Sequence, residues 1–177
     1  MKIIKKFDTL SMAIQEIYQQ LAFIDAKNIC FDIDDTIVFD DYRNTPNVQV
    51  VQMVLFLQKN DYNIHFITAR LDSAEMRQQT KKEIKNAGIT LKAKDSLTLA
   101  PAKNRDSMVQ ISQWKYATRK NIKNVAVTVG DQWGDSVQIH AEDDIDKLDK
   151  LCNVKITPWI VLQPDDGVAV LGLKLMS

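Results

Sequence analysis

The segment "NICFDIDDTIVFDD", residues 28–41, places acidic side chains within a strongly apolar run. Ile29 and Phe31 are typical of a buried strand, whereas Asp32 and Asp34 stand two residues apart at its end. Residues two apart share one face of an extended chain, so these carboxylates would lie close together and repel one another. A buried pair of like charges requires a compensating group.

Two later apolar runs also end in polar residues. "NIHFIT" ends at Thr68, and "NVAVTVGD" ends at Asp131, with Asp135 soon after. In a parallel sheet, ligands bind beyond the carboxyl ends of the strands. Oxygen ligands suit Mg²⁺, and a site with Mg²⁺, acids and a lysine suits an anionic phosphoryl substrate. We therefore expect a Mg²⁺ site built from these carboxylates: Asp32, Asp34, Asp131 and Asp135.

The rest of the chain predicts helices alternating with short strands. The expected helices cover residues 10–23, 45–59, 72–88, 106–120 and 136–150. The expected strands cover residues 28–33, 63–68, 95–100 (a strand or an extended loop), 124–129 and two segments around a turn at 164–167. This order predicts an α/β fold with a Rossmann-like, doubly wound, mainly parallel sheet and a C-terminal β-hairpin.

Local signals predict where two of these helices begin. Thr45 and Pro46 suit an N-cap and a first helical position. Asp72 stands three residues before Glu75, as in a capping box, and Gly88 suits the end of the same helix.

Composition indicates one domain, residues 1–177, with the helix at 10–23 packed on its core. Its 23 basic and 23 acidic residues give no electrostatic footprint for nucleic-acid binding as a main function. No apolar run approaches the roughly 18 residues of a membrane span, and the first residues do not resemble a signal peptide. The two cysteines form no disulfide or metal pattern, so we expect reduced thiols and a cytoplasmic protein.

The motifs together resemble those of the haloacid dehalogenase-like superfamily of phosphatases. "DIDDT" is similar to its Asp-x-Asp-x-Thr motif, "IHFITAR" to its second motif and "VAVTVGDQWGD" to its fourth. "FDIDDTIVF" and "GDQWGD" resemble more narrowly the acid phosphatase branch, which includes bacterial class B and plant-type enzymes. The resemblance covers about residues 10–160 and implies the core fold of that superfamily.

The resemblance also implies a role for each motif residue. Asp32 would be the nucleophile that forms an aspartyl-phosphate, and Asp34 would act as general acid and then general base. The backbone carbonyl of Asp34 would also bind Mg²⁺. Thr68 would bind phosphate, Asp131 would bind Mg²⁺, and Asp135 would orient the metal's waters or the phosphate-site lysine.

Two assignments of phosphate-binding residues stay open at this point. Lys115, with Arg119 four residues on, fits the family's Lys-x-x-x-Arg helix, while Lys103 is the alternative lysine. Arg70 follows Thr68 where acid phosphatases often have Thr-Gly-Arg, with Ala69 here in the middle position. Arg70 therefore suits either a phosphate contact or a structural role.

The intervals between Thr36 and Thr68 and between Thr68 and Lys115 are mostly filled by helices and strands. They leave no room for a cap domain of about 50 residues. We expect an open site that accepts phosphomonoesters, including nucleotides and phosphorylated polynucleotide ends, with the oligomeric state left open. The alternatives are a phosphatase-like binding protein without turnover and a response-regulator receiver, whose phosphorylated aspartate ends a later strand.

Overall fold

The structure is a computed structural model that describes residues 2–7, 9–23, 25–39, 43–132, 135, 159–163 and 168–174. The strands at 2–7, 159–163 and 168–174 are described by their backbone alone. The helix predicted at 136–150 and the turn predicted at 164–167 lie outside these ranges.

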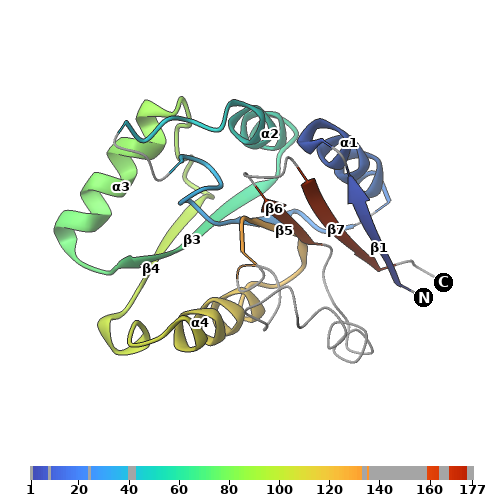
Figure 1. Ribbon diagram of the computed structural model, residues 1–177. Coiled ribbons are helices and arrows are strands. Elements are labelled where there is room, and N and C mark those ends of the chain that lie inside the picture. Colours follow the sequence, from blue (N-terminus) through green and yellow to red (C-terminus); the bar gives the residue numbers. More distant parts are fainter. Residues whose placement is uncertain are drawn as a thin grey trace.

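A seven-stranded sheet crosses the molecule in the order β1-β7-β6-β5-β2-β3-β4 (Figure 1). From β6 to β4 all neighbours are parallel, whereas β7 is antiparallel to both β6 and β1. The strands are β1 (Lys2–Phe7), β2 (Asn28–Phe31), β3 (Asn63–Leu71), β4 (Ser96–Ala100), β5 (Val125–Gly130), β6 (Trp159–Gln163) and β7 (Val168–Lys174).

Helices cover both faces of the sheet, as the doubly wound prediction requires. Figure 1 shows α1 and α2 above the sheet and α4 below it. Ile84 of α3 belongs to the same hydrophobic core as α1 and α2, so α3 covers that face as well. The bounds are α1 (Leu10–Leu21), α2 (Val48–Lys59), α3 (Ala74–Asn86), the short 3₁₀ helix η1 (Ala102–Asn104) and α4 (Met108–Lys120).

The main core lies between the sheet and α1 to α3. In α1, Ala13, Ile14, Ile17 and Leu21 are buried at helical spacing. This confirms the predicted amphipathic helix, which ends at Leu21 rather than at residue 23. Tyr18 of α1 and Phe56 of α2 hold these two helices together, with ring centroids 4.4 Å apart.

The predicted start of α2 is wrong. Thr45 and Pro46 do not begin the helix, because the chain there pairs with the segment after β2. Pro46 bridges Val38, and the backbone N–H of Asn47 donates to the carbonyl of Ile37 at 2.9 Å. This pairing keeps Pro46 outside the helix, and Asn47 serves as the N-cap instead.

The predicted start of α3 is also wrong, by one residue. Ser73 is the N-cap, and its hydroxyl accepts from the backbone N–H of Met76 at 3.1 Å. The side chain of Asp72 instead pairs with Arg77 at 2.5 Å. Gly88 follows the helix with a φ of 96°, which confirms the predicted C-terminal end.

At the far edge of the sheet, β6 and β7 are antiparallel neighbours, which confirms the predicted C-terminal hairpin strands. Strand β1 was not predicted. It pairs with β7 over residues 2–7, a contact between distant parts of the sequence that local patterns do not reveal. In the part of the chain that the structure describes, the connections between β2 and β5 hold only α2, β3, α3, β4, η1 and α4, so no cap domain interrupts them.

Candidate functional site

Strand β2 lies at the point where the chain changes direction across the sheet. From β2 the chain passes to β3 and β4 on one side, and it returns to β5 on the other side. In parallel sheets the crevice at such a switch point is the usual ligand site. Asp32 follows β2 directly, and its backbone N–H donates to the carbonyl of Val129 in β5 at 2.9 Å. The first predicted site residue therefore lies at this crevice.

Three predicted carboxylates meet there. Oxygens of Asp32, Asp131 and Asp135 all lie within 4.8 Å of one another. Asp32 and Asp135 are each only 6% exposed. Lys115 enters from α4, where its Nζ donates to Oδ1 of Asp32 at 2.7 Å and also contacts Asp135. The sheet and α4 thus enclose three acids and one lysine.

Two of these carboxylates, Asp32 and Asp135, are buried and Asp131 is half-buried, and Lys115 does not offset the full cost of ionising them. Burial raises the pKa of Asp32 to about 7, and the charge of Asp135 adds to this effect while Lys115 opposes it. Burial likewise raises the pKa of Asp131 to about 9, again with a contribution from Asp135. Although burial alone would lower the pKa of Lys115, Asp32 and Asp135 raise it overall, so the amine stays charged.

The backbone around Gly130 is shaped to receive Asp135. A Cβ added to Gly130 would lie 2.2 Å from the Cβ of Asp135, far closer than atoms can approach. The backbone N–H of Gln132 donates to Oδ2 of Asp135 at 3.1 Å, and the N–H of Asp135 donates to the carbonyl of Gln132 at 3.0 Å. The first glycine of "GDQWGD" therefore fixes the position of its last aspartate.

Asp34 takes a different position from the other three acids. Its carboxylate accepts from Nε of Arg70 at 3.0 and 3.2 Å, from Nη2 of Arg70 at 2.5 Å and from the hydroxyl of Thr68 at 3.2 Å. The cluster of Asp32, Asp131 and Asp135 does not include the Asp34 carboxylate. Metal binding through the Asp34 backbone carbonyl stays a prediction.

The structure separates the two candidate lysines. Lys115 is 5% exposed and contacts Asp32, whereas Lys103 lies exposed in η1. Lys115 is therefore the lysine that α4 brings to the predicted nucleophile.

Several more residues lie next to the site, and apart from Arg119 they were not predicted from the sequence. Thr36 donates to Oδ1 of Asp131 at 3.5 Å. Thr80 and Glu83 of α3 contact Arg70. Arg119 is 7% exposed; burial lowers its pKa, and the charges of Asp135 and Asp32 oppose this shift. The family's Lys-x-x-x-Arg spacing pointed to Arg119, but no sequence pattern pointed to Thr80 or Glu83.

The donor set fits a hard divalent cation. Three carboxylates offer oxygen ligands only, which Mg²⁺ prefers, and the site contains no soft ligand such as a thiolate among the described residues. Burial raises the pKa values of Asp32 and Asp131 because their negative charges are only partly compensated. A bound divalent cation would supply the missing positive charge.

The sequence matches no model of a known protein family and no curated protein. Among the described residues, each helix is too short or too polar to cross a lipid bilayer.

Proposed function

We propose that the protein is a Mg²⁺-dependent phosphomonoester hydrolase that acts through an aspartyl-phosphate on Asp32. The observation that carries the proposal is the buried cluster of Asp32, Asp131 and Asp135 with Lys115, at the switch point of a parallel sheet. The motif resemblance supports it, because the clustered residues come from the motifs "DIDDT" and "GDQWGD".

Within this proposal the cation is held by Asp32, Asp131 and Asp135. When bound, it supplies charge neutralisation for the substrate phosphoryl group. Lys115 contributes the second positive charge, and its 2.7 Å contact favours the ionised form of Asp32 against the effect of burial. An ionised Asp32 is what nucleophilic attack needs.

The reaction then takes two steps. An oxygen of Asp32 attacks phosphorus, the bond to the ester oxygen breaks, and Asp34 gives its proton to the leaving oxygen. A water then attacks phosphorus, Asp34 takes a proton from it, and the bond to Asp32 breaks to release inorganic phosphate. The carboxylate of Asp34 lies outside the metal cluster and is held by Thr68 and Arg70, so this proton transfer requires its release from them.

A site that no inserted domain covers in the described ranges of the chain leaves room for bulky phosphomonoesters, and nucleotides are the first substrate class. A phosphorylated polynucleotide end is the second substrate class, since no inserted domain closes the site among the described residues.

The test is hydrolysis of p-nitrophenyl phosphate, a nucleotide panel and a 5′-phosphorylated oligonucleotide, with Mg²⁺ and with EDTA. Asp32→Asn should lower turnover by at least about 10³-fold. Asp61→Asn is the matched control, because the Asp61 side chain is 93% exposed and pairs only with Lys94 among the described contacts. It should leave turnover unchanged.

Undiminished activity in EDTA or in Asp32→Asn would overturn the mechanism. Absence of turnover on every ester, with Mg²⁺ still bound, would favour a binding protein without catalysis.

A further inference from the structure

The carboxylate of Asp34 is held by Thr68, to which the motif resemblance gives a phosphate-binding role, and by Arg70, a candidate for the same role. Thr68 donates its hydroxyl to Oδ2 at 3.2 Å. Arg70 approaches with Nε and Nη2 together, the closest contact being 2.5 Å from Nη2 to Oδ1. Both donors are therefore engaged by a residue of the protein itself.

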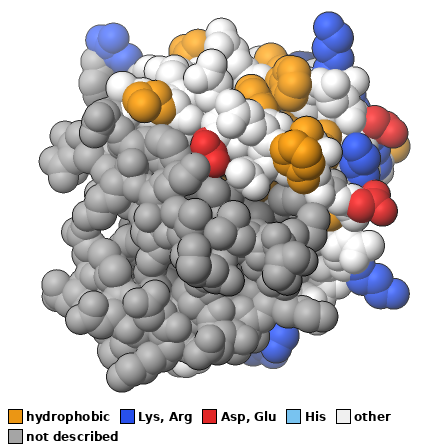
Figure 2. All heavy atoms as spheres, turned by 90° about the vertical axis from the view of Figure 1, so that its right-hand side faces the viewer, with side chains coloured by type: hydrophobic (Ala, Val, Ile, Leu, Met, Phe, Trp, Pro, Cys, Tyr) orange, Lys and Arg blue, Asp and Glu red, His pale blue; other side chains and the backbone are white. Residues whose placement is uncertain are grey.

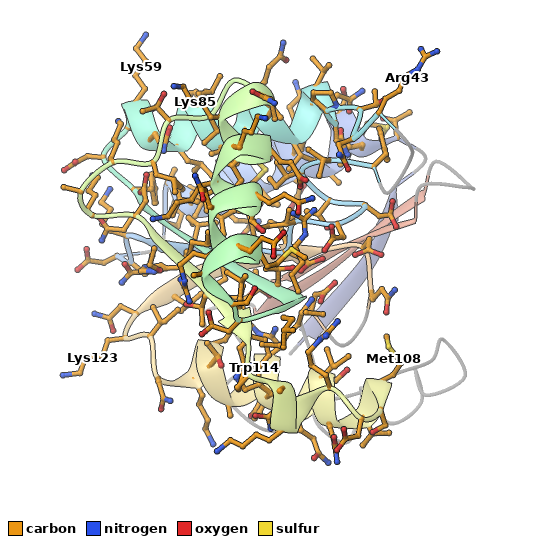
Figure 3. The ribbon with its side chains drawn as sticks, turned by 90° about the vertical axis from the view of Figure 1, so that its left-hand side faces the viewer. Arg43, Lys59, Lys85, Met108, Trp114 and Lys123 are labelled. Carbon is orange, nitrogen blue, oxygen red and sulfur yellow. The ribbon has the colours of Figure 1, made fainter. Side chains whose placement is uncertain are left out.

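Arg70 is in turn fixed from α3. Its Nη1 donates to the hydroxyl of Thr80 at 3.2 Å and to the carboxylate of Glu83. The side chains of Arg70 and Glu83 are only 13% and 11% exposed. Figure 3 views the molecule from the side of α3, the helix that carries these contacts and ends near Lys85. Two neighbours on a regular helix thus set the direction of the guanidinium group.

A guanidinium fork and a hydroxyl form the donor set that binds phosphoryl oxygens in proteins. These donors lie near the proposed nucleophile. Asp34 follows Asp32 by only two residues, just after β2, so its carboxylate and the side chains that hold it stand beside the crevice that contains Asp32. The carboxylate of Asp34 therefore stands where an anion beside Asp32 would find its donors.

We propose that Thr68 and Arg70 form an anion subsite that the Asp34 carboxylate occupies until a phosphoryl group displaces it. Glu83 and Thr80 are positioning residues, because they hold Arg70 in place while a phosphoryl group replaces the carboxylate of Asp34. The inference rests on the proposed function for the identity of that phosphoryl group as substrate. Under that function, substrate binding itself releases Asp34 to serve the leaving group.

An internal occupant lowers the apparent affinity for any competing anion, because only the fraction of molecules with a free subsite can bind it. Removing the Asp34 carboxylate should therefore strengthen phosphate binding, but only where Arg70 is present. If Asp34→Ala acted only by removing a negative charge, it would strengthen phosphate binding whether or not Arg70 is present. The dependence on Arg70 separates these two explanations.

The experiment is a double-mutant cycle on binding of inorganic phosphate to the Mg²⁺-loaded protein, measured by calorimetry. We expect Asp34→Ala to tighten phosphate binding about tenfold and Arg70→Met to weaken it about tenfold. In the Arg70→Met background, Asp34→Ala should change the affinity less than about threefold. Glu83→Gln should weaken binding by a smaller factor than Arg70→Met.

The matched control is a second arginine–aspartate pair, formed by Arg77 of α3 and by Asp72, which precedes that helix. Arg77 and Asp72 form a 2.5 Å contact at a half-exposed position, so Arg77→Met and Asp72→Ala should leave phosphate affinity unchanged. If Arg70→Met does not fold, Arg70→Lys replaces it, because lysine keeps the charge but not the forked guanidinium group. Asp34→Ala should then also raise the phosphate affinity less than it does when Arg70 is present.

If Asp34→Ala raised the affinity for phosphate equally with and without Arg70, the proposed subsite would be wrong. It would also be wrong if Arg70→Met left the phosphate affinity unchanged. Failure of the proposed function gives a different result: phosphate binds and the cycle shows coupling, but no phosphomonoester is hydrolysed. Hydrolysis without coupling between Asp34 and Arg70 would overturn the inference alone.

Discussion

The side chain of Asp135 lies where the Cβ of any residue other than glycine at position 130 would lie. This arrangement ties one carboxylate of the cluster to the geometry of the backbone at the end of β5. A glycine here is required by close approach, since its φ is not in the left-handed region.

Gly130→Ala should displace Asp135 from Lys115 and from the other acids. We expect Mg²⁺ affinity to fall about tenfold or more, as when a group that orients a metal ligand is lost. A Mg²⁺ titration followed by calorimetry measures this change.

Gly88→Ala is the control for that experiment. No atom lies within 4 Å of a Cβ at Gly88, but its φ of 96° makes alanine strained. This variant should lose about 1 kcal/mol of stability and keep its Mg²⁺ affinity. Equal Mg²⁺ affinity in both variants would contradict the role given to Gly130.

At the scale of elements, α4 carries a buried face that is polar. Ser112, Lys115 and Arg119 are its buried residues, spaced so that they share one side of the helix. Most surface helices bury an apolar stripe, so this face is explained by the acids that it meets at the ends of β2 and β5.

Lys115→Met should destabilise the metal-free protein, because it removes the buried amine that donates to both Asp32 and Asp135. Removing one partner of a buried ion pair costs roughly 3–5 kcal/mol, and added Mg²⁺ should restore part of the loss. Urea unfolding with EDTA and with Mg²⁺ measures both effects.

Lys103→Met is the matched control, since Lys103 is exposed in η1. Its stability should change by less than about 0.5 kcal/mol. If Lys103→Met lowered the free energy of unfolding as much as Lys115→Met does, the contacts of Lys115 with Asp32 and Asp135 would not explain its effect.

At the scale of the whole molecule, the sequence predicted the parallel core and the three clustered acids. It succeeded because continuous apolar runs mark buried parallel strands, and each of these runs ends in a polar residue at one edge. On that ground Asp32 and Asp131 could be assigned to one site, whereas the carboxylate of Asp34, also expected there, lies outside the cluster.

The features that the sequence did not reveal depend on contacts between distant residues. Asp72 and Thr45 are typical helix-start residues, but neither begins a helix. Asp72 pairs with Arg77, and the segment at Thr45 pairs with the one near Ile37. The pairing of Arg70 with Asp34 crosses from β3 to the loop after β2. No local pattern encodes which partner a charged side chain will find.

The described surface on the α1 side carries exposed hydrophobic side chains among polar ones (Figure 2). On α1 and just after it, Met12 and Phe23 are 49% and 75% exposed. Scattered apolar groups of this kind are ordinary on soluble surfaces, so they carry no functional assignment.

The stability of the metal-free protein should fall as pH rises from about 4 to about 9. Burial raises the pKa of Asp32 to about 7 and that of Asp131 to about 9, whereas both titrate near 4 in an unfolded chain. The unfolded chain thus releases its protons first, and the stability present at low pH is lost as each folded carboxyl ionises. Thermal unfolding in EDTA across this range checks the slope.

Mg²⁺ should reverse this trend, because it binds the ionised carboxylates and competes with protons. Its stabilisation should grow with pH and reach about 2.7 kcal/mol when Mg²⁺ is at a hundred times its dissociation constant. Asp131→Asn should flatten the slope in EDTA. A metal-free protein that gains stability over this range would contradict the burial of uncompensated acids.

The order of the strands also has a kinetic consequence. The segment from β2 through α2 to β3 is contiguous, and the residues it brings together, Asp34 with Thr68 and Arg70, are 34 and 36 residues apart. Asp131 and Asp135 join Asp32 only when β5 pairs with β2, across almost a hundred residues, as in the partnership of Asn28 with Val125. Closing so long a loop is slow, because its entropy is lost before the contacts form. A folding chain would therefore assemble its anion donors early and its cluster of acids late, so that a bound cation slows unfolding more than it speeds folding.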